Sequence, residues 1–239
     1  MRPRTLIAGI ACLALAITCA RLGLWQLSRW GEKRRWNADC RAAAIARPET
    51  LAPPLPALAA LRGRRLRLAG RYDEAWHVVL DARWRDDSAG VEVVTPLRLA
   101  GGSAVLVDRG WLASADAMSA SDSALAEPGE RTVTGIAEPM ARGRGPAWSR
   151  LPHLSATAWS ARRLDPDSVR ARLPYAVAPW VLHALPDSLA PQRFVRSLPL
   201  AENEIMHLSY AVQWALFSLA FVAGGWLVAA RDRAARARA

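Results

Sequence analysis

The stretch LSYAVQWALFSLAFVAGGWLVAA, residues 208–230, decides how this chain is organised. It runs for 23 residues without a charged side chain and is followed directly by Arg231 and three further arginines. About 20 apolar residues in a helix are enough to cross the hydrocarbon core of a bilayer. The sequence therefore predicts a membrane-spanning helix over residues 207–230 and a basic tail over residues 231–239.

A second apolar run lies near the N-terminus. Residues 6–20 are uncharged, Arg21 interrupts the run, and LGLWQL at 22–27 continues it. As one helix, residues 6–27 extend about 33 Å, which is enough to cross a membrane. A cleaved signal peptide is the alternative, but no small-residue cleavage site follows the apolar core. We therefore expect an uncleaved anchor over residues 6–27, preceded by a short segment, residues 1–5.

The positive charge is concentrated beside these two runs. The 239 residues carry a net charge of +11, of which +7 lies in residues 1–47 and +3 in residues 231–239. Basic residues beside apolar runs are typical of membrane proteins, and no nucleic-acid-binding motif accompanies them. We expect the lipid membrane as a partner and no nucleic acid. Two spans place both termini on one side of the membrane, but the basic residues that follow both spans leave open which side.

The chain between the spans, residues 28–206, is predicted to form a β-rich domain. Gly101-Gly102 between two strand-like runs is typical of a hairpin turn. The fold class is a membrane protein with two transmembrane helices flanking a mainly antiparallel β domain of the α+β type. The strand candidates are short runs with turn signals between them, at 65–70, 76–81, 91–99, 104–108 and 131–137, with weaker ones at 177–183 and 194–196.

Motifs of the common enzyme classes are absent from the sequence. It contains no GxSxG, HExxH, Walker loop, GxGxxG or CxxC. Cys12 and Cys19 lie seven residues apart in the first apolar run, and they are either a redox pair or small buried side chains. His77, His153 and His183 have no metal-ligand spacing. These residues give no case for a hydrolase, and we expect a protein that is not an enzyme and has no catalytic residues.

His207 differs from the other histidines because it opens the second apolar run. On a helix, His207, Tyr210, Ala211 and Trp214 fall at i, i+3, i+4 and i+7, which is one face. An ionisable residue on a membrane helix is a candidate for function, and neutral imidazole is a common ligand of haem iron. The alternative is a histidine at the membrane interface beside belt aromatics.

The first apolar run ends with a similar face. Arg21, Trp25 and Arg29 fall at i, i+4 and i+8 of a helix. An arginine at this place pairs with a carboxylate or a haem propionate, or else it extends to lipid phosphate. Both interpretations remain open on the residues alone.

Five motifs, in order and with both apolar runs, make the chain resemble the Surfeit locus protein 1 family. One departure is Asp108, where the family more often has Asn, but a carboxylate before Arg-Gly also closes a strand-end turn. Residues 113–200 match only loosely. The motifs are GLWQLSR at 23–29, GRYD at 70–73, GVEVVTPL at 90–97, VLVDRGW at 105–111 and HLSYAVQW at 207–214.

This resemblance implies an assembly factor for haem-copper terminal oxidases in cytochrome c oxidase biogenesis. It implies a domain in the periplasm, both termini in the cytoplasm and, in a bacterium, a place in the inner membrane. Bacterial members are similar to haem a carriers, so His207 is expected to ligate haem iron, with Tyr210, Trp214, Trp25, Arg21 and Arg29 around the macrocycle. The expected partners are haem a synthase and oxidase subunit I, and a second copy of the chain is left open. The alternative is a scaffold that stabilises nascent subunit I without binding haem.

Overall fold

The computed structural model describes residues 3–55, 58–121, 125–140, 143, 145, 147–151, 154, 157–186, 193–201 and 203–238. The chain divides into two compact units. The first, called here the helix pair, consists of Met1–Ala38 and Leu200–Ala239. The second, called here the β domain, is Asp39–Pro199.

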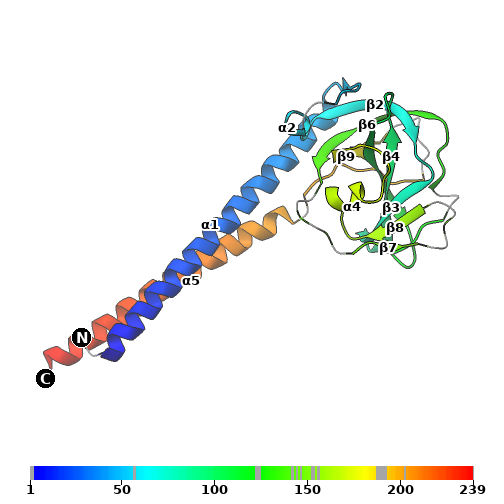
Figure 1. Cartoon of the computed structure of the whole chain (residues 1–239). Coiled ribbons are helices and arrows are strands. Elements are labelled where there is room, and N and C mark those ends of the chain that lie inside the picture. The colour runs from blue at the N-terminus through cyan, green and yellow to red at the C-terminus, as the bar shows by residue number, and fades with distance from the viewer. Residues whose placement is uncertain are drawn as a thin grey trace. The chain divides into compact units, whose positions relative to one another are not determined.

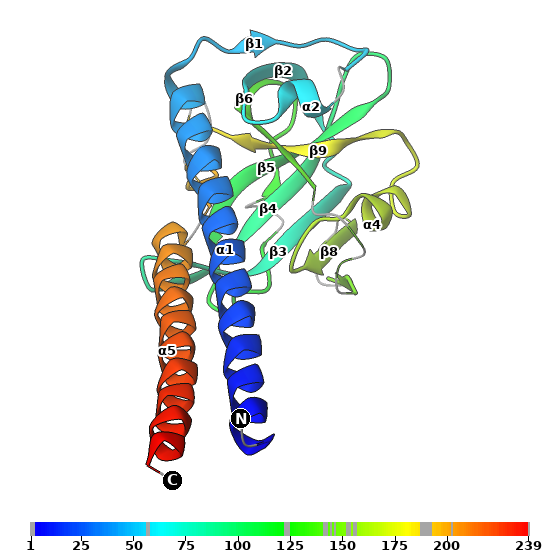
Figure 2. The same cartoon turned by 90° about the vertical axis from the view of Figure 1, so that its left-hand side faces the viewer.

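Two long helices, α1 (Pro3–Ile45) and α5 (Glu204–Ala237), supply the helix pair. Their most apolar 18-residue windows have mean hydropathies of 2.0 and 1.7, and only 17% and 6% of those windows are buried. By length and composition both helices are therefore able to cross a membrane. Figures 1 and 2 show them side by side, with the two termini at the same end.

Both helices are longer than the predicted spans. α1 continues for 18 residues beyond Leu27, and α5 begins three residues before His207 and continues seven residues beyond Ala230. Residues 28–45 contain no proline, and buried Trp36 and Cys40 recur at helical spacing, so the helix continues until Pro48 disfavours it. The expectation of a β-rich segment beginning at residue 28 is therefore wrong for its first 18 residues. Which part of each helix crosses a membrane stays a prediction.

The β domain is built around one sheet. Its strand order is β1-β2-β6-β9-β5-β4-β3-β8-β7, and a further pairing of β2 with β4 closes β2, β6, β9, β5 and β4 into a ring. The label β4 in Figure 1 marks the strand that belongs to the ring and also pairs with β3. In chain order the elements are β1 (Glu49–Thr50), α2 (Leu58–Leu61), β2 (Arg65–Tyr72), β3 (Trp76–Arg85), β4 (Ser88–Arg98), β5 (Ala104–Ala113), β6 (Glu130–Pro139), β7 (Ser149–Arg150), β8 (Thr157–Ala161), α4 (Pro166–Arg170) and β9 (Val177–Ala184).

Pairing in this sheet is mixed. Among the described residues, the pairs β2–β4, β2–β6, β3–β4, β4–β5, β6–β9 and β7–β8 are antiparallel, and the hairpin signal Gly101-Gly102 predicted β4–β5 among them. The pairs β1–β2, β3–β8 and β5–β9 are parallel, and the sequence did not predict them. Parallel partners need a long crossover connection, so no local turn signal marks them.

Most strand candidates lie where the sequence predicts them. The five stronger candidates overlap β2, β3, β4, β5 and β6, and residues 177–183 lie within β9. Gly101 and Gly102 form the turn between β4 and β5 with φ of +88° and +86°, which glycine adopts without a steric penalty. Residues 194–196 form no strand, because Val195 makes only an isolated bridge with Trp111. The strand β8 was missed, since TAWSA lacks a clear alternation.

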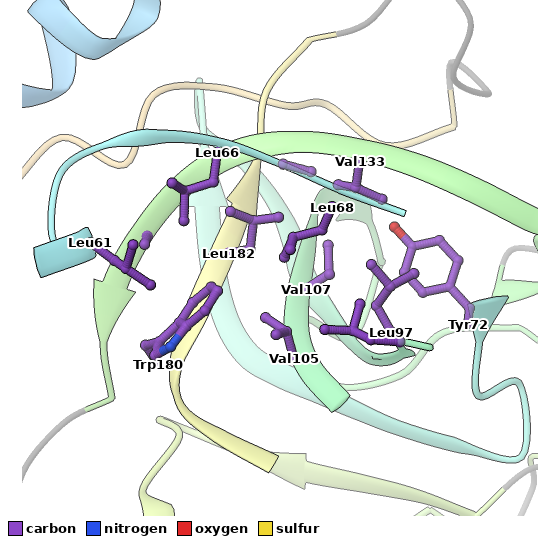
Figure 3. Packing of buried hydrophobic residues seen from close by; sticks show 13 residues of the cluster. Leu61, Leu66, Leu68, Tyr72, Leu97, Val105, Val107, Val133, Trp180 and Leu182 are labelled. Carbon is purple, nitrogen blue, oxygen red and sulfur yellow. The ribbon is translucent and has the colours of Figure 1, made fainter. Parts of the chain in front are cut away.

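The main core fills the ring, as Figure 3 shows. Val105 and Val107 of β5 are fully buried, as the uninterrupted apolar run of that strand predicts. Each fully buried aliphatic side chain stabilises the fold by about 1.5–3 kcal/mol relative to exposure. The other buried side chains labelled there are Leu61, Leu66, Leu68, Tyr72, Leu97, Val133, Trp180 and Leu182.

Arg109 of β5 lies buried between two aromatic rings. Its guanidinium carbon is 4.9 Å from the Tyr72 ring centroid and 4.6 Å from that of Phe194. One terminal nitrogen donates to the Leu125 carbonyl at 2.6 Å, and the other is 3.4 Å from a Glu127 carboxylate oxygen. Both charged side chains are buried, so each depends on the other for compensation.

Asp108, next to Arg109, has two roles in the β domain. One carboxylate oxygen accepts a hydrogen bond from the Gly110 backbone at 2.9 Å. The expectation of a strand-end turn here is wrong, because β5 continues to Ala113 and this contact lies inside the strand, where its register with β4 shifts. The other is 2.9 Å from Nδ1 of His183, whose Nε2 is 2.8 Å from Glu138. Burial alone would lower the pKa of His183, but the hydrogen bonds to Asp108 and Glu138 raise this pKa to about 10. His183 is therefore a charged structural group.

This cluster predicts a loss of stability at alkaline pH. A histidine in an unfolded chain has a pKa of about 6.5, so protonated His183 stabilises the fold fully below that pH. The contribution is lost as the pH rises from about 6.5 through 10, and it is on the order of a few kcal/mol. Thermal unfolding of the full chain in detergent, measured from pH 6 to 10, should show a steeper decline for the natural chain than for His183→Gln. Parallel curves for the two proteins would contradict this interpretation.

Candidate functional site

Small and polar side chains form the contact line between α1 and α5. Small residues allow helix backbones to approach closely, which is how helices associate in membranes. The Ser218 hydroxyl donates to the Ala16 carbonyl at 2.9 Å, and a Cβ placed on Gly23 would lie only 3.5 Å from Cβ of Trp214. On α5 the line follows a seven-residue spacing through Glu204, Ala211, Ser218, Gly225 and Asp232, and on α1 it includes Thr5, Cys12, Ala16, Cys19, Gly23, Gln26 and Asn37.

Cys12 and Cys19 of α1 belong to this contact line. Cys19 is buried, Cys12 is half-buried, and both are free thiols. Seven residues of helix separate their backbones by about 10.5 Å, which is too far for a disulfide. A redox pair between them is therefore excluded in this helix, and the prediction of small packing side chains agrees with their burial.

His207 faces α1 and is hydrogen-bonded across the helix pair. Its Nδ1 lies 2.6 Å from Oε1 of Gln26, a residue 181 positions earlier in the chain. Both side chains are half-buried. A carboxamide oxygen accepts only, so Nδ1 of the ring donates in this arrangement. Gln26 is the direct partner of the histidine that the sequence singles out.

The second ring nitrogen of His207 has no hydrogen-bond partner in the described part of the chain. In a neutral imidazole whose Nδ1 carries the proton, Nε2 holds a lone pair and is able to bind a metal. No group of three or more His, Cys, Asp or Glu among the described residues is placed to hold a metal ion. A single imidazole donor would fit a haem iron, because the macrocycle supplies its other nitrogen ligands.

Trp214 and Tyr210 differ in position. Trp214 is half-buried beside Gly23, and its ring packs edge-on to Phe217 with centroids 5.9 Å apart. Tyr210 is 46% exposed, although the helical spacing predicts that it shares the face of His207. Each residue of a helix is rotated by about 100° from the one before it. Tyr210 therefore lies to one side of the face of α5 on which His207 and Ala211 contact α1.

Three residues of α1 were expected near His207, and the structure places them on a face of α1 that, among the described residues, does not contact α5. Arg21, Trp25 and Arg29 are all exposed and follow a different face of α1 from Gly23 and Gln26. Arg29 forms an ion pair with Glu32 at 2.5 Å, and the charges of Arg29 and Lys33 act on the His207 ring. No contact joins Arg21 or Trp25 to His207 among the residues that the structure describes.

Comparison with known protein families identifies the family of this chain. The sequence matches the SURF1 family over residues 13–219, which covers most of the chain. The chain belongs to the SURF1 family. The resemblance to the Surfeit locus protein 1 family is thereby confirmed, and membership suggests a role in cytochrome c oxidase assembly. SURF1-family members are assembly factors and not known enzymes. No curated protein matches the chain at a significant level.

In this SURF1-family chain, the side chain of Asn37 links α1 to the start of α5 by hydrogen bonds. Its side chain is buried, its oxygen accepts from the Ala201 backbone at 2.7 Å, and its nitrogen donates to Glu204 at 2.8 Å. α5 needs this support because Asn203, its N-cap residue, is left-handed with φ of 56° and makes no capping bond. Asn37 therefore sets the register in which His207, one turn into α5, meets α1.

Replacement of this asparagine should loosen the helix pair. Asn37→Ala leaves the Ala201 N–H without its buried partner, which costs about 1–3 kcal/mol. We expect a melting temperature several degrees lower than that of the natural chain in the same detergent. Asn203→Gly is the matched control, because it keeps the left-handed backbone and removes a side chain without a capping bond. Equal melting temperatures for Asn37→Ala and the control would show that Asn37 does not fasten the helices.

Gln26 and Asn37 are the two residues of this site that sequence reasoning missed. Gln26 stood inside the GLWQLSR motif but was not assigned a role. The available signal was spacing: Cys12, Cys19 and Gln26 recur every seven residues, as in helices packed with a coiled-coil geometry.

Of the other histidines, buried His77 forms a hydrogen bond with Thr95, and His183 is ion-paired. His153 lies outside the described residues.

Proposed function

We propose that this chain carries haem a during assembly of haem-copper terminal oxidases and delivers it to oxidase subunit I. The observation that carries the proposal is the His207–Gln26 pair, which leaves one imidazole nitrogen without a partner among the residues that the structure describes. SURF1-family membership supports the oxidase context. Neutral imidazole is a well-suited axial ligand for haem iron. Haem is the cargo in this scheme, so the chain need not make or break covalent bonds.

His207 and its surroundings define the proposed haem site. His207 is the iron ligand, and Trp214 packs against the macrocycle, with Tyr210 at its edge. Arg29 and Lys33 provide positive charge for the haem propionates, because both act electrostatically on the His207 ring. Arg21 and Trp25 follow the exposed face of α1, where they contact lipid headgroups in this proposal.

We further propose that the chain resides in the bacterial inner membrane, with the β domain in the periplasm. Two apolar helices with both termini at one end support a two-span topology (Figure 2). The four arginines after residue 230 favour a cytoplasmic location for that end. In this orientation His207, near the start of α5, lies close to the periplasmic side. Haem a synthase is then the donor of the haem, and subunit I is the acceptor.

A cellular experiment separates the carrier from the scaffold. Cells that lack this gene are complemented with the natural chain, with His207→Ala or with Ser209→Ala, an exposed neighbour on the same turn. Subunit I and its haem a content are then measured. A carrier predicts that His207→Ala leaves subunit I protein present but poor in haem a, while Ser209→Ala restores both. If His207→Ala restores haem a fully and neither purified protein binds haem a, the chain is a scaffold that stabilises subunit I without binding haem.

A further inference from the structure

Gln26 controls which nitrogen of His207 is available. A neutral imidazole carries one proton, and its partner decides where that proton resides. The amide oxygen of Gln26 lies 2.6 Å from Nδ1 and accepts a hydrogen bond there. The proton is therefore held on Nδ1, and the lone pair is on Nε2. An unpartnered histidine would populate both tautomers and rotate about its side-chain bonds.

Contacts on both sides hold this pair in register. Three residues before Gln26, Gly23 lies against Ala211 and Trp214, since a Cβ there would be 3.5 Å from the Ala211 carbonyl oxygen and from Cβ of Trp214. Eleven residues after Gln26, Asn37 binds both Ala201 and Glu204. The Gln26–His207 hydrogen bond lies between these two contacts. Its geometry therefore depends on the packing of the helix pair and not on two loose side chains.

We propose that Gln26 is the positioning residue of this site, which presents Nε2 of His207 as the donor to haem iron with a strength suited to release. The inference rests on the proposed function and deepens it. A carboxylate in place of the amide would draw the Nδ1 proton and make the imidazole a stronger donor. A neutral amide fixes the same tautomer, but the imidazole then donates less electron density to the iron. That combination suits a carrier, which has to give up its cargo.

The first test needs no haem. The full chain is labelled with ¹⁵N-histidine, purified in detergent without haem, and the ring nitrogens of its four histidines are recorded by NMR, with His207→Gln for assignment. The expected spectrum has His207 with a protonated Nδ1 and an unprotonated Nε2, and Gln26→Leu shifts it toward a mixture. Gln213→Leu, an exposed glutamine on α5, serves as the control and leaves the spectrum unchanged. A protonated Nε2 in the natural chain would overturn the inference, whatever the chain binds.

The second test uses the haem-loaded chain. Gln26→Leu is expected to weaken haem a binding roughly ten- to hundredfold, the usual effect of losing a partner behind a metal ligand. Gln26→Glu should raise the iron–histidine stretching frequency in resonance Raman spectra, lower the haem reduction potential and slow haem release. If all three readouts equal those of the natural chain while His207→Ala loses haem, the proposed function stands and the role of Gln26 fails. If His207→Ala keeps its haem, the proposed ligand itself is wrong.

Discussion

The Arg109→Leu variant should lose about 3–5 kcal/mol of folding free energy, the largest effect on stability that we expect from any single charged residue. Arg109 is fully buried, donates to Leu125 and Thr95, and lies 3.4 Å from buried Glu127. Without it, the nearest cation to Glu127 is Arg196, at 3.9 Å. Thermal unfolding of the full chain in detergent should show a drop in melting temperature of roughly 10 °C.

Two companion variants test whether the buried charge is the cause. Arg83→Leu removes an ion pair that is one-third exposed and should cost no more than about 1 kcal/mol. The double variant Arg109→Leu, Glu127→Leu removes both buried charges and should be more stable than Arg109→Leu alone. If the double variant is no more stable than the single one, the loss of the stacking on Tyr72 and Phe194 explains the effect instead.

His207→Ala should abolish tight binding of haem a, which is the largest effect we expect on function. Removing the only proposed protein ligand of the iron should weaken binding at least a hundredfold, equivalent to about 2.7 kcal/mol or more. The measurement is a titration of the haem-free chain with haem a in detergent, followed by absorption. Because the histidine is only half-buried, the variant should keep the melting temperature of the natural chain within a few degrees.

Ser209→Ala provides the matched control for that titration. Ser209 is exposed on the same helical turn, and its hydroxyl donates to the Ile205 carbonyl within α5. We expect its haem affinity to equal that of the natural chain. Equal affinities for His207→Ala and Ser209→Ala would place the ligand elsewhere in the chain.

The sequence predicted those features that arise from local patterns. The apolar runs predicted two helices, and the short strand-like runs and Gly101-Gly102 predicted β2 to β6 with one hairpin turn. The extension of α1 to Ile45 was missed, because its charged residues suggested that the helix ended with the membrane span. The parallel pairs β3–β8 and β5–β9 were missed because they join strands distant in sequence.

The candidate site was predicted only in part. His207 stood out by its place at the start of an apolar run, and Trp214 by its spacing from it. The position of Tyr210, and the separation of Arg21 and Trp25 from His207, depend on how each helix is rotated toward the other. Spacing along one helix predicts which residues share a face, but it does not predict which face contacts a partner helix. The role of Gln26 as the partner of His207 can be identified only when the register between α1 and α5 is known.

The most direct measurement is the visible absorption spectrum of the full chain. The chain is purified in mild detergent from cells that make haem a, and in parallel from cells that lack haem a synthase. A carrier predicts haem a bands from the first preparation in a fixed proportion to protein, and no haem a bands from the second. Intact, folded chain without haem a from both preparations would contradict the proposal that this SURF1-family protein carries haem a.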